Sequence, residues 1–285
     1  MVSVDVQKLS STLFKQGYDD TICFAAATLN GLVLRDPSKI DQAASELRLT
    51  GRTRLGNLEL TSNDNLKRLA SANYRRWGVC EDRALLLLAL AEAMNGDLIL
   101  TTDNQGNIGS MCYRTGNFIL GGKIEWVAAT NSRIMGSSLY LREQMGTTGF
   151  EKILPKVQQG SLLSLIWDEI SQSRHLLVVA KVENGRVYFL DSIPTSCGYF
   201  RSLFDSARVD GANVWSVELS ELCASGRIRY VVAQQGLAPV DLTFRDHSAQ
   251  LQLVEGLENF CVAHFLESKK QRENRALRFL ERPTD

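Results

Sequence analysis

The feature that most constrains the fold is a pair of apolar, β-branched runs that flank an Asn-Gly dipeptide. The runs cover residues 176–182 and 187–190, and Asn184 and Gly185 stand between them. Asn-Gly between two such runs is a strong signal for a β-hairpin. We therefore expect an antiparallel sheet that contains this hairpin.

The hairpin carries His175 at the start of its first strand and Asp191 at the end of its second. With a two-residue loop, the numbers of paired residues add to an odd total, which puts His175 and Asp191 on opposite faces. They share a face if the loop has an odd length, as in a type I turn with a G1 bulge at Gly185, or if a strand contains a bulge. The odd loop would set His175 opposite Asp191 and Val179 opposite Val187. On a shared face, the carboxylate can bind one ring nitrogen and leave the other for a nucleophile.

A candidate nucleophile is Cys80, in the string Gly78-Val79-Cys80-Glu81 that precedes the apolar run 85–91. A cysteine after a glycine turn, at the start of a helix, lies near unpaired backbone N–H groups and the positive end of the helix dipole. Such a place favours the thiolate over the thiol. We predict Cys80 as the nucleophile, His175 as its base and Asp191 as the acid that orients the base.

Composition excludes several other classes of protein. The chain has 285 residues, 44% hydrophobic and 22% charged, which is typical of one large or two small globular domains. Its 32 basic and 32 acidic side chains balance, so no nucleic-acid partner is expected. No run approaches the roughly 18 apolar residues of a membrane span, and the first residues do not resemble a signal peptide.

The six cysteines are scattered, without a Cys-x-x-Cys pair. This spacing argues against a zinc site and against a disulfide scaffold, so we expect no cofactor and reduced thiols. A chain of this kind is expected to be cytoplasmic, or to be exported by a route that reads no ordinary signal peptide.

Hydrophobic periodicity predicts an α+β fold with a helical N-terminal part and a helical C-terminus. Three regions are expected: 1–75, which is part of the core or covers it, the core at 76–235, and the C-terminal region at 236–285. Helices are expected at residues 4–15, 21–34, 40–47, 65–74, 80–95 and 248–280. Strands are expected at residues 98–100, 160–167, 176–182, 187–190, 214–217 and 228–233.

The residues from Gly78 to Leu90 resemble the nucleophile helix of the transglutaminase-like superfamily, where Gly-x-Cys-x-Asp-x-Ala opens an apolar helix. That superfamily shares its core with the papain-like cysteine proteases, and His175 and Asp191 on successive strands resemble both groups. The long gap from Cys80 to His175 is similar to papain-like proteases, including bacterial effector proteases. The resemblance implies a papain/transglutaminase-like fold in which the nucleophile helix packs on a central antiparallel sheet. It also suggests Trp77 as a screen for the thiolate or as part of an oxyanion site.

A second string, from Gln16 to Ala26, resembles the papain-type motif. In that motif a Gln before the Cys supplies an oxyanion donor, and aromatic and small residues follow the Cys. Here Gln16 is seven residues before Cys23, one more than usual, and the usual Gly beside the Cys is missing. Cys23 therefore remains the alternative nucleophile, with Gln16 as its oxyanion donor.

These motifs predict a cysteine-dependent acyl-transfer enzyme that forms a thioester, and our first hypothesis is a thiol protease acting on a protein or peptide. A glutamine deamidase or transglutaminase of the same fold is an alternative, because the pocket and not the triad chooses the acceptor. A binding protein with an idle site is another alternative, in which a carbonyl satisfies His175 and Asp191 caps the turn at 193–194. A bacterial effector role is a further hypothesis.

Overall fold

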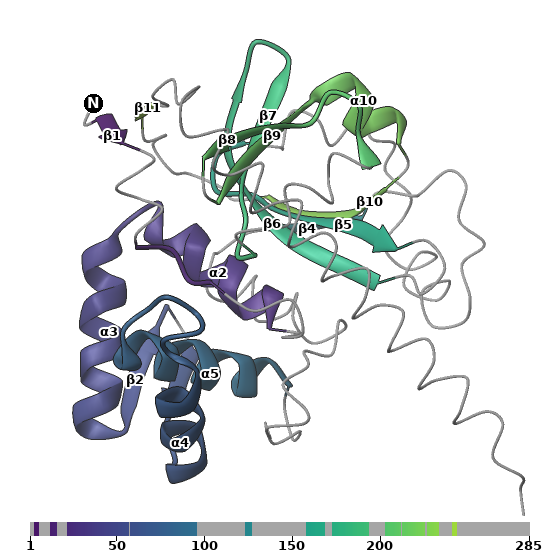
Figure 1. Ribbon diagram of the computed structural model, residues 1–285. Helices are drawn as coiled ribbons and strands as arrows, with labels where there is room; N and C mark the ends of the chain where they lie inside the picture. Colours follow the sequence, from purple (N-terminus) through teal and green to yellow (C-terminus); the bar gives the residue numbers. More distant parts are fainter. Residues whose placement is uncertain are drawn as a thin grey trace, which may run out of the picture.

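The computed structural model describes an α+β arrangement of helices and antiparallel sheets (Figure 1). The residues that it describes are 3–5, 12–15, 22–56, 58–95, 123–126, 158–168, 173–193, 203–211, 213–225, 227–233 and 241–243.

The described helices are α2 (Cys23–Val33), α3 (Pro37–Thr50), α4 (Asp64–Asn73), α5 (Glu81–Asn95) and α10 (Leu219–Ala224). The first four confirm the helices predicted between residues 21 and 95, and their starts follow from local chemistry. The side chains of Asp36 and Asn63 accept from backbone N–H groups in the first turns of α3 and α4. The helix expected at 4–15 is wrong at its start, because Ser3–Asp5 form strand β1.

Seven strands form the main sheet, in the order β4-β10-β5-β6-β7-β9-β8. Their bounds are β4 (Lys123–Trp126), β10 (Ile228–Ala233), β5 (Leu162–Asp168), β6 (Ser173–Glu183), β7 (Arg186–Leu190), β9 (Val214–Glu218) and β8 (Arg208–Gly211). Every neighbouring pair in this sheet is antiparallel. Two small sheets complete the described strands: β2 (Arg52–Leu55) pairs antiparallel with β3 (Leu58–Thr61), and β1 pairs parallel with β11 (Asp241–Thr243).

The β6–β7 hairpin confirms the predicted turn and corrects its register. Glu183 pairs with Arg186 across a two-residue loop, and both loop residues have positive φ, 50° at Asn184 and 75° at Gly185. This is the type I′ conformation that Asn-Gly favours, so the odd-length loop is wrong. A bulge between Val179 and Lys181 then shifts the pairing by one residue.

The bulge is the second of the two devices that the sequence allowed. Beyond it Val179 pairs with Phe189 and not with Val187, so the register expected from the odd loop is wrong by two residues. The shift makes the sum of paired numbers even, and His175 and Asp191 therefore alternate to the same face.

Strand β6 is buried on both faces. Leu176, Val178 and Ala180 of β6 belong to a core shared with the helices α2 to α5, which we call the helix-side core. Leu177 and Val179, at the alternate positions, belong to a second core with Phe204 and Leu222, which we call the α10-side core. Burial on both faces explains why β6 reads as a continuous apolar run.

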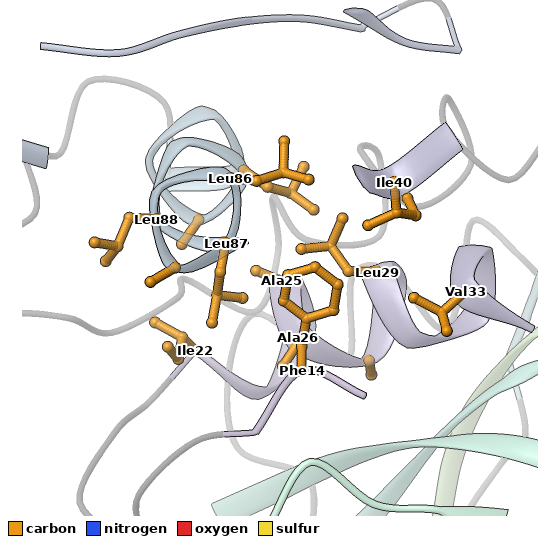
Figure 2. Packing of buried hydrophobic residues seen from close by; sticks show 14 of the residues in the cluster. Phe14, Ile22, Ala25, Ala26, Leu29, Val33, Ile40, Leu86, Leu87 and Leu88 are labelled. Carbon is orange, nitrogen blue, oxygen red and sulfur yellow. The ribbon is translucent and has the colours of Figure 1, made fainter. Parts of the chain in front are cut away.

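Helix α2 lies between the sheet and the other N-terminal helices (Figure 1). It packs on β6 on one side and on α3 and α5 on the other, and all its residues except Leu32 are buried. Figure 2 shows Ala25, Ala26 and Leu29 of α2 facing the side chains of Leu86 and Leu87 of α5. A helix that is apolar on every side is typical of such a central position.

Residues 12–15 are tied to this helical layer by two buried polar side chains. The amide of Asn30 in α2 accepts from the backbone N–H of Phe14 at 2.7 Å and donates to the Phe14 carbonyl at 3.0 Å. Arg83 of α5 donates to the Thr12 carbonyl and to Asp41 of α3, and its guanidinium lies 5.5 Å from the Phe14 ring centroid. The chain is therefore fixed shortly before it enters α2.

Two predicted segments lie outside the described residues, namely the strand at 98–100 and the helix at 248–280, and so do residues 6–11 of the helix predicted at 4–15. The sequence did not predict β1, β4, β8, β11 or α10, which are short elements of at most six residues. Of the helices described, none has the length and apolar character that a membrane crossing requires.

We expect Asn30→Ala to lower the free energy of unfolding by about 2–4 kcal/mol, because it leaves both backbone groups of Phe14 buried without a partner. Urea unfolding measures this loss. Asn73→Ala is the control: its amide donates to the Leu69 carbonyl within its own helix, and the change should stay within about 0.5 kcal/mol. Equal effects of the two substitutions would contradict the stabilising role of the two hydrogen bonds between Asn30 and Phe14.

Candidate functional site

The candidate site is built around a buried hydrogen bond between His175 and Asp191. Nε2 of His175 lies 2.7 Å from Oδ1 of Asp191, and the two residues are 2% and 0% exposed. His175 is near the start of β6 and Asp191 follows the last residue of β7, so both stand at the end of the hairpin opposite its turn. An ionised carboxylate only accepts hydrogen bonds, which assigns the Nε2 proton to the imidazole.

The Asp191 carboxylate is held by further N–H donors. The backbone N–H of Ile193 donates to Oδ1 at 2.9 Å, and the indole N–H of Trp215 donates to Oδ2 at 3.2 Å. A buried carboxylate is costly unless such donors replace water. The donors come from the loop after β7 and from the neighbouring strand β9, so the acid is fixed on two sides.

Asn213, the residue before β9, fixes the backbone of the acid. The N–H of Asp191 donates to the Asn213 carbonyl at 2.9 Å, and the side-chain amide of Asn213 donates to the Asp191 carbonyl at 2.8 Å. This pairing continues the β7–β9 ladder by one step beyond Leu190 and Val214. The orientation of the acid is thus a property of the sheet.

Among the described cysteines, Cys23 is the one that meets this pair. It is the first residue of α2 and is 8% exposed, and its side chain interacts with His175 through a hydrogen bond and through charge. Because Asp191 occupies Nε2, the ring nitrogen left for Cys23 is Nδ1. The first turn of α2 contains no acidic residue, so the positive end of the helix dipole acts on the sulfur without an opposing charge from that turn.

The imidazole of His175 is held in its cationic form. Burial by itself lowers the pKa of His175, but the charge and hydrogen bond of Asp191, with smaller contributions from Cys23, raise it to about 10. The ring therefore keeps both N–H protons at neutral pH, one toward Asp191 and one toward Cys23.

The structure does not bring Cys80, the predicted nucleophile, to His175. Cys80 is exposed and directly precedes α5. The next residue, Glu81, binds Arg48 of α3 at 2.9 Å and the Ser71 hydroxyl of α4, which fixes this end of α5 between those helices. The glycine turn and helix start that pointed to Cys80 are present, with Gly78 at a φ of 61°, and the described contacts of this helix end are with α3 and α4.

The sequence also suggested roles for Trp77 and Gln16. Trp77 is fully buried in the helix-side core. Gln16, the expected oxyanion donor of the alternative motif, lies outside the described residues.

Sequence reasoning missed Asn213 and Trp215. It read residues 214–217 as a strand and gave the indole no role. A signal was present, because a tryptophan inside a buried strand needs a partner for its N–H. Which partner it finds depends on strand order, since Trp215 and Asp191 lie on adjacent strands.

No protein-family model matches this chain, and no curated protein matches it. The site also offers no ligand set for a metal: among the described residues, no group of three or more His, Cys, Asp or Glu side chains is arranged to hold an ion. What can be said of the chemistry therefore comes from the thiol, the imidazole and the carboxylate themselves.

His175 should make the protein less stable as the pH rises. The pKa of His175 is about 10 in the folded state and about 6.5 in the unfolded state. Its contribution to the free energy of unfolding is therefore complete below about pH 6.5 and is lost as the pH rises toward 10. Between pH 6.5 and 9.5 we expect the wild type to lose on the order of 1–3 kcal/mol more unfolding free energy than His175→Gln.

Urea titrations at several pH values measure this difference. Asp191→Asn provides a second comparison, because it removes the carboxylate whose charge raises the pKa of His175. The unfolding free energy of Asp191→Asn should depend on pH as weakly as that of His175→Gln, and more weakly than that of the wild type. A wild-type slope no steeper than that of either variant would show that the pair is not ionised as described.

Proposed function

We propose that this protein is a cysteine-dependent acyl-transfer enzyme with Cys23 as nucleophile, His175 as general acid and base, and Asp191 as the orienting acid. The observation that carries the proposal is the meeting of a thiol at a helix N-terminus with an imidazole that is already bound to a buried carboxylate. Nucleophile, base and orienting group within reach of one another are the signature of covalent catalysis.

The chemistry follows from the protons of His175. The Cys23 thiolate attacks a carbonyl carbon, and the new C–S bond pushes the carbonyl electrons onto oxygen. Collapse of this intermediate expels an amine, which takes the proton from Nδ1, and leaves a thioester on Cys23. Nδ1 then accepts a proton from water as the water attacks the thioester, which releases the acid and restores the thiolate.

The arrangement favours a papain/transglutaminase-like core. A cysteine opens a helix that packs on an antiparallel sheet, and the base and the acid follow on successive strands of that sheet. By this likeness we propose hydrolysis of a peptide or isopeptide bond in a protein or peptide substrate. A deamidase or transamidase would use the same residues with another acceptor, and the effector setting remains a prediction from the sequence.

An idle binding protein is the second candidate, and one observation favours it. Cys23, His175 and Asp191 are only 8%, 2% and 0% exposed, which suits a group of polar side chains that satisfy one another inside the core. The two functions differ in the reactivity of the Cys23 thiol. A buried cysteine whose side chain only completes a hydrogen-bonded group is expected to react slowly at low pH.

Alkylation by iodoacetamide distinguishes an enzyme from an idle binding protein. Mass spectrometry follows the reaction at each cysteine. We expect Cys23 to react at pH 6–7 in spite of its burial, because a cationic imidazole next to a cysteine favours nucleophilic attack by its sulfur. His175→Ala should slow Cys23 at pH 6–7 by about tenfold or more and leave the exposed Cys80 unchanged. Cys80 serves as the internal control for accessibility.

Two results would overturn the assignment. Slow alkylation of Cys23 at every pH, with no effect of His175→Ala, would leave an idle site. Fast alkylation of Cys80 at pH 6–7 that depends on His175 would return the nucleophile to the residue first predicted.

A reactive ester tests the thioester itself. With p-nitrophenyl acetate we expect a burst of p-nitrophenolate and an acetyl group on Cys23, both absent in Cys23→Ala and retained in Cys80→Ala. Turnover after the burst measures hydrolysis, and faster turnover with added amine would identify a transamidase. Acetylation confined to exposed lysines would contradict the proposed nucleophile.

A further inference from the structure

We propose that Trp215 is a positioning residue, whose indole N–H fixes the Asp191 carboxylate and thereby the orientation of the His175 ring. The inference starts from the 3.2 Å hydrogen bond between Nε1 of Trp215 and Oδ2 of Asp191. It rests on the proposed function only for its effect on the Cys23 thiol.

The hydrogen bonds of Asp191 fix its carboxylate plane. Oδ1 accepts from His175 and from the backbone N–H of Ile193, both on the side of the β6–β7 hairpin. Oδ2 accepts from Trp215, on the side of β9. A carboxylate can rotate about its Cβ–Cγ bond when one oxygen is held, and donors on both oxygens oppose that rotation.

The Trp215 ring is itself well placed to hold the bond. Its centroid lies 4.7 Å from that of Phe189 and 6.4 Å from that of Phe204, and the residue is 1% exposed in the α10-side core. Phe189 and Trp215 are also direct partners in the β7–β9 ladder. The packing of the α10-side core therefore sets the direction of the indole N–H.

The consequence for His175 is geometric. Because Nε2 donates to Oδ1, the plane of the carboxylate decides where the opposite nitrogen, Nδ1, points. Trp215 holds Asp191, Asp191 holds His175, and His175 meets Cys23. This chain of contacts connects the face of the sheet that α10 covers with the first residue of α2.

The test uses Trp215→Phe, which removes the N–H and keeps an aromatic ring. Trp77→Phe is the matched control, because Trp77 is equally buried but lies in the helix-side core. Proton NMR at neutral pH reports the His175 Nε2 proton as a signal shifted far downfield by its bond to Asp191, and absence of this signal in His175→Gln assigns it. Cys23 alkylation at pH 6.5 is measured on the same samples.

We expect the downfield signal in the wild type and in Trp77→Phe, and its loss or broadening in Trp215→Phe with alkylation of Cys23 slowed by about tenfold. If Trp215→Phe fails to fold, benzothienylalanine at position 215 keeps the bicyclic shape without the N–H and should give the same result. Phe189→Leu, which disturbs the packing and keeps the N–H, should retain the signal.

The role is overturned if the wild type has no such signal, or if Trp215→Phe keeps both the signal and the alkylation rate. It is also overturned if the signal is lost while His175-dependent alkylation is unchanged. If the signal depends on Trp215 but alkylation of wild-type Cys23 does not depend on His175, the positioning role stands and the proposed function fails.

Discussion

The buried carboxylate of Asp191 is the constraint on which the arrangement of the site depends. A charge with no access to water must be surrounded by donors, and each donor has to come from an element that the fold fixes. Here they come from β6, from the loop after β7 and from β9. The order of these strands in the sheet therefore places the donors around the carboxylate, and a shift in any pairing would leave the charge among apolar side chains.

The second requirement is a helix that can be buried on every side. Helix α2 meets the sheet on one side and α3 and α5 on the other, so its axis is held by both layers (Figures 1 and 2). The bonds of Asn30 and Arg83 to residues 12–15 fix the chain that leads into it. Because Cys23 is the first residue of this helix, the packing of both layers also determines where the sulfur lies.

The β6–β7 hairpin shows which structural features local sequence patterns predict and which they do not. Asn184-Gly185 predicted the turn correctly, because the positive φ of both residues is a local preference. Parity then required either an odd loop or a bulge for His175 and Asp191 to share a face. The bulge falls at Ala180, between Val179 and Lys181, and none of these residues is the Gly or Pro that marks a bulge in a sequence. The bulge forms because the strands must fill the helix-side core and the α10-side core at the same time.

The sequence by itself determined the helices from residue 23 to residue 95 and the β6–β7 turn. These depend on periodicity, capping and turn preferences, which act over a few residues. Which cysteine lies beside His175, the hydrogen bond between His175 and Asp191, and the contacts of Trp215 and Asn213 with Asp191 were decided by tertiary structure alone. Both cysteines open buried helices, and what separates them is that α2 packs on β6 whereas the start of α5 is held by α3 and α4. Contacts between residues so far apart in the chain are fixed by the filling of shared cores, which no local pattern encodes.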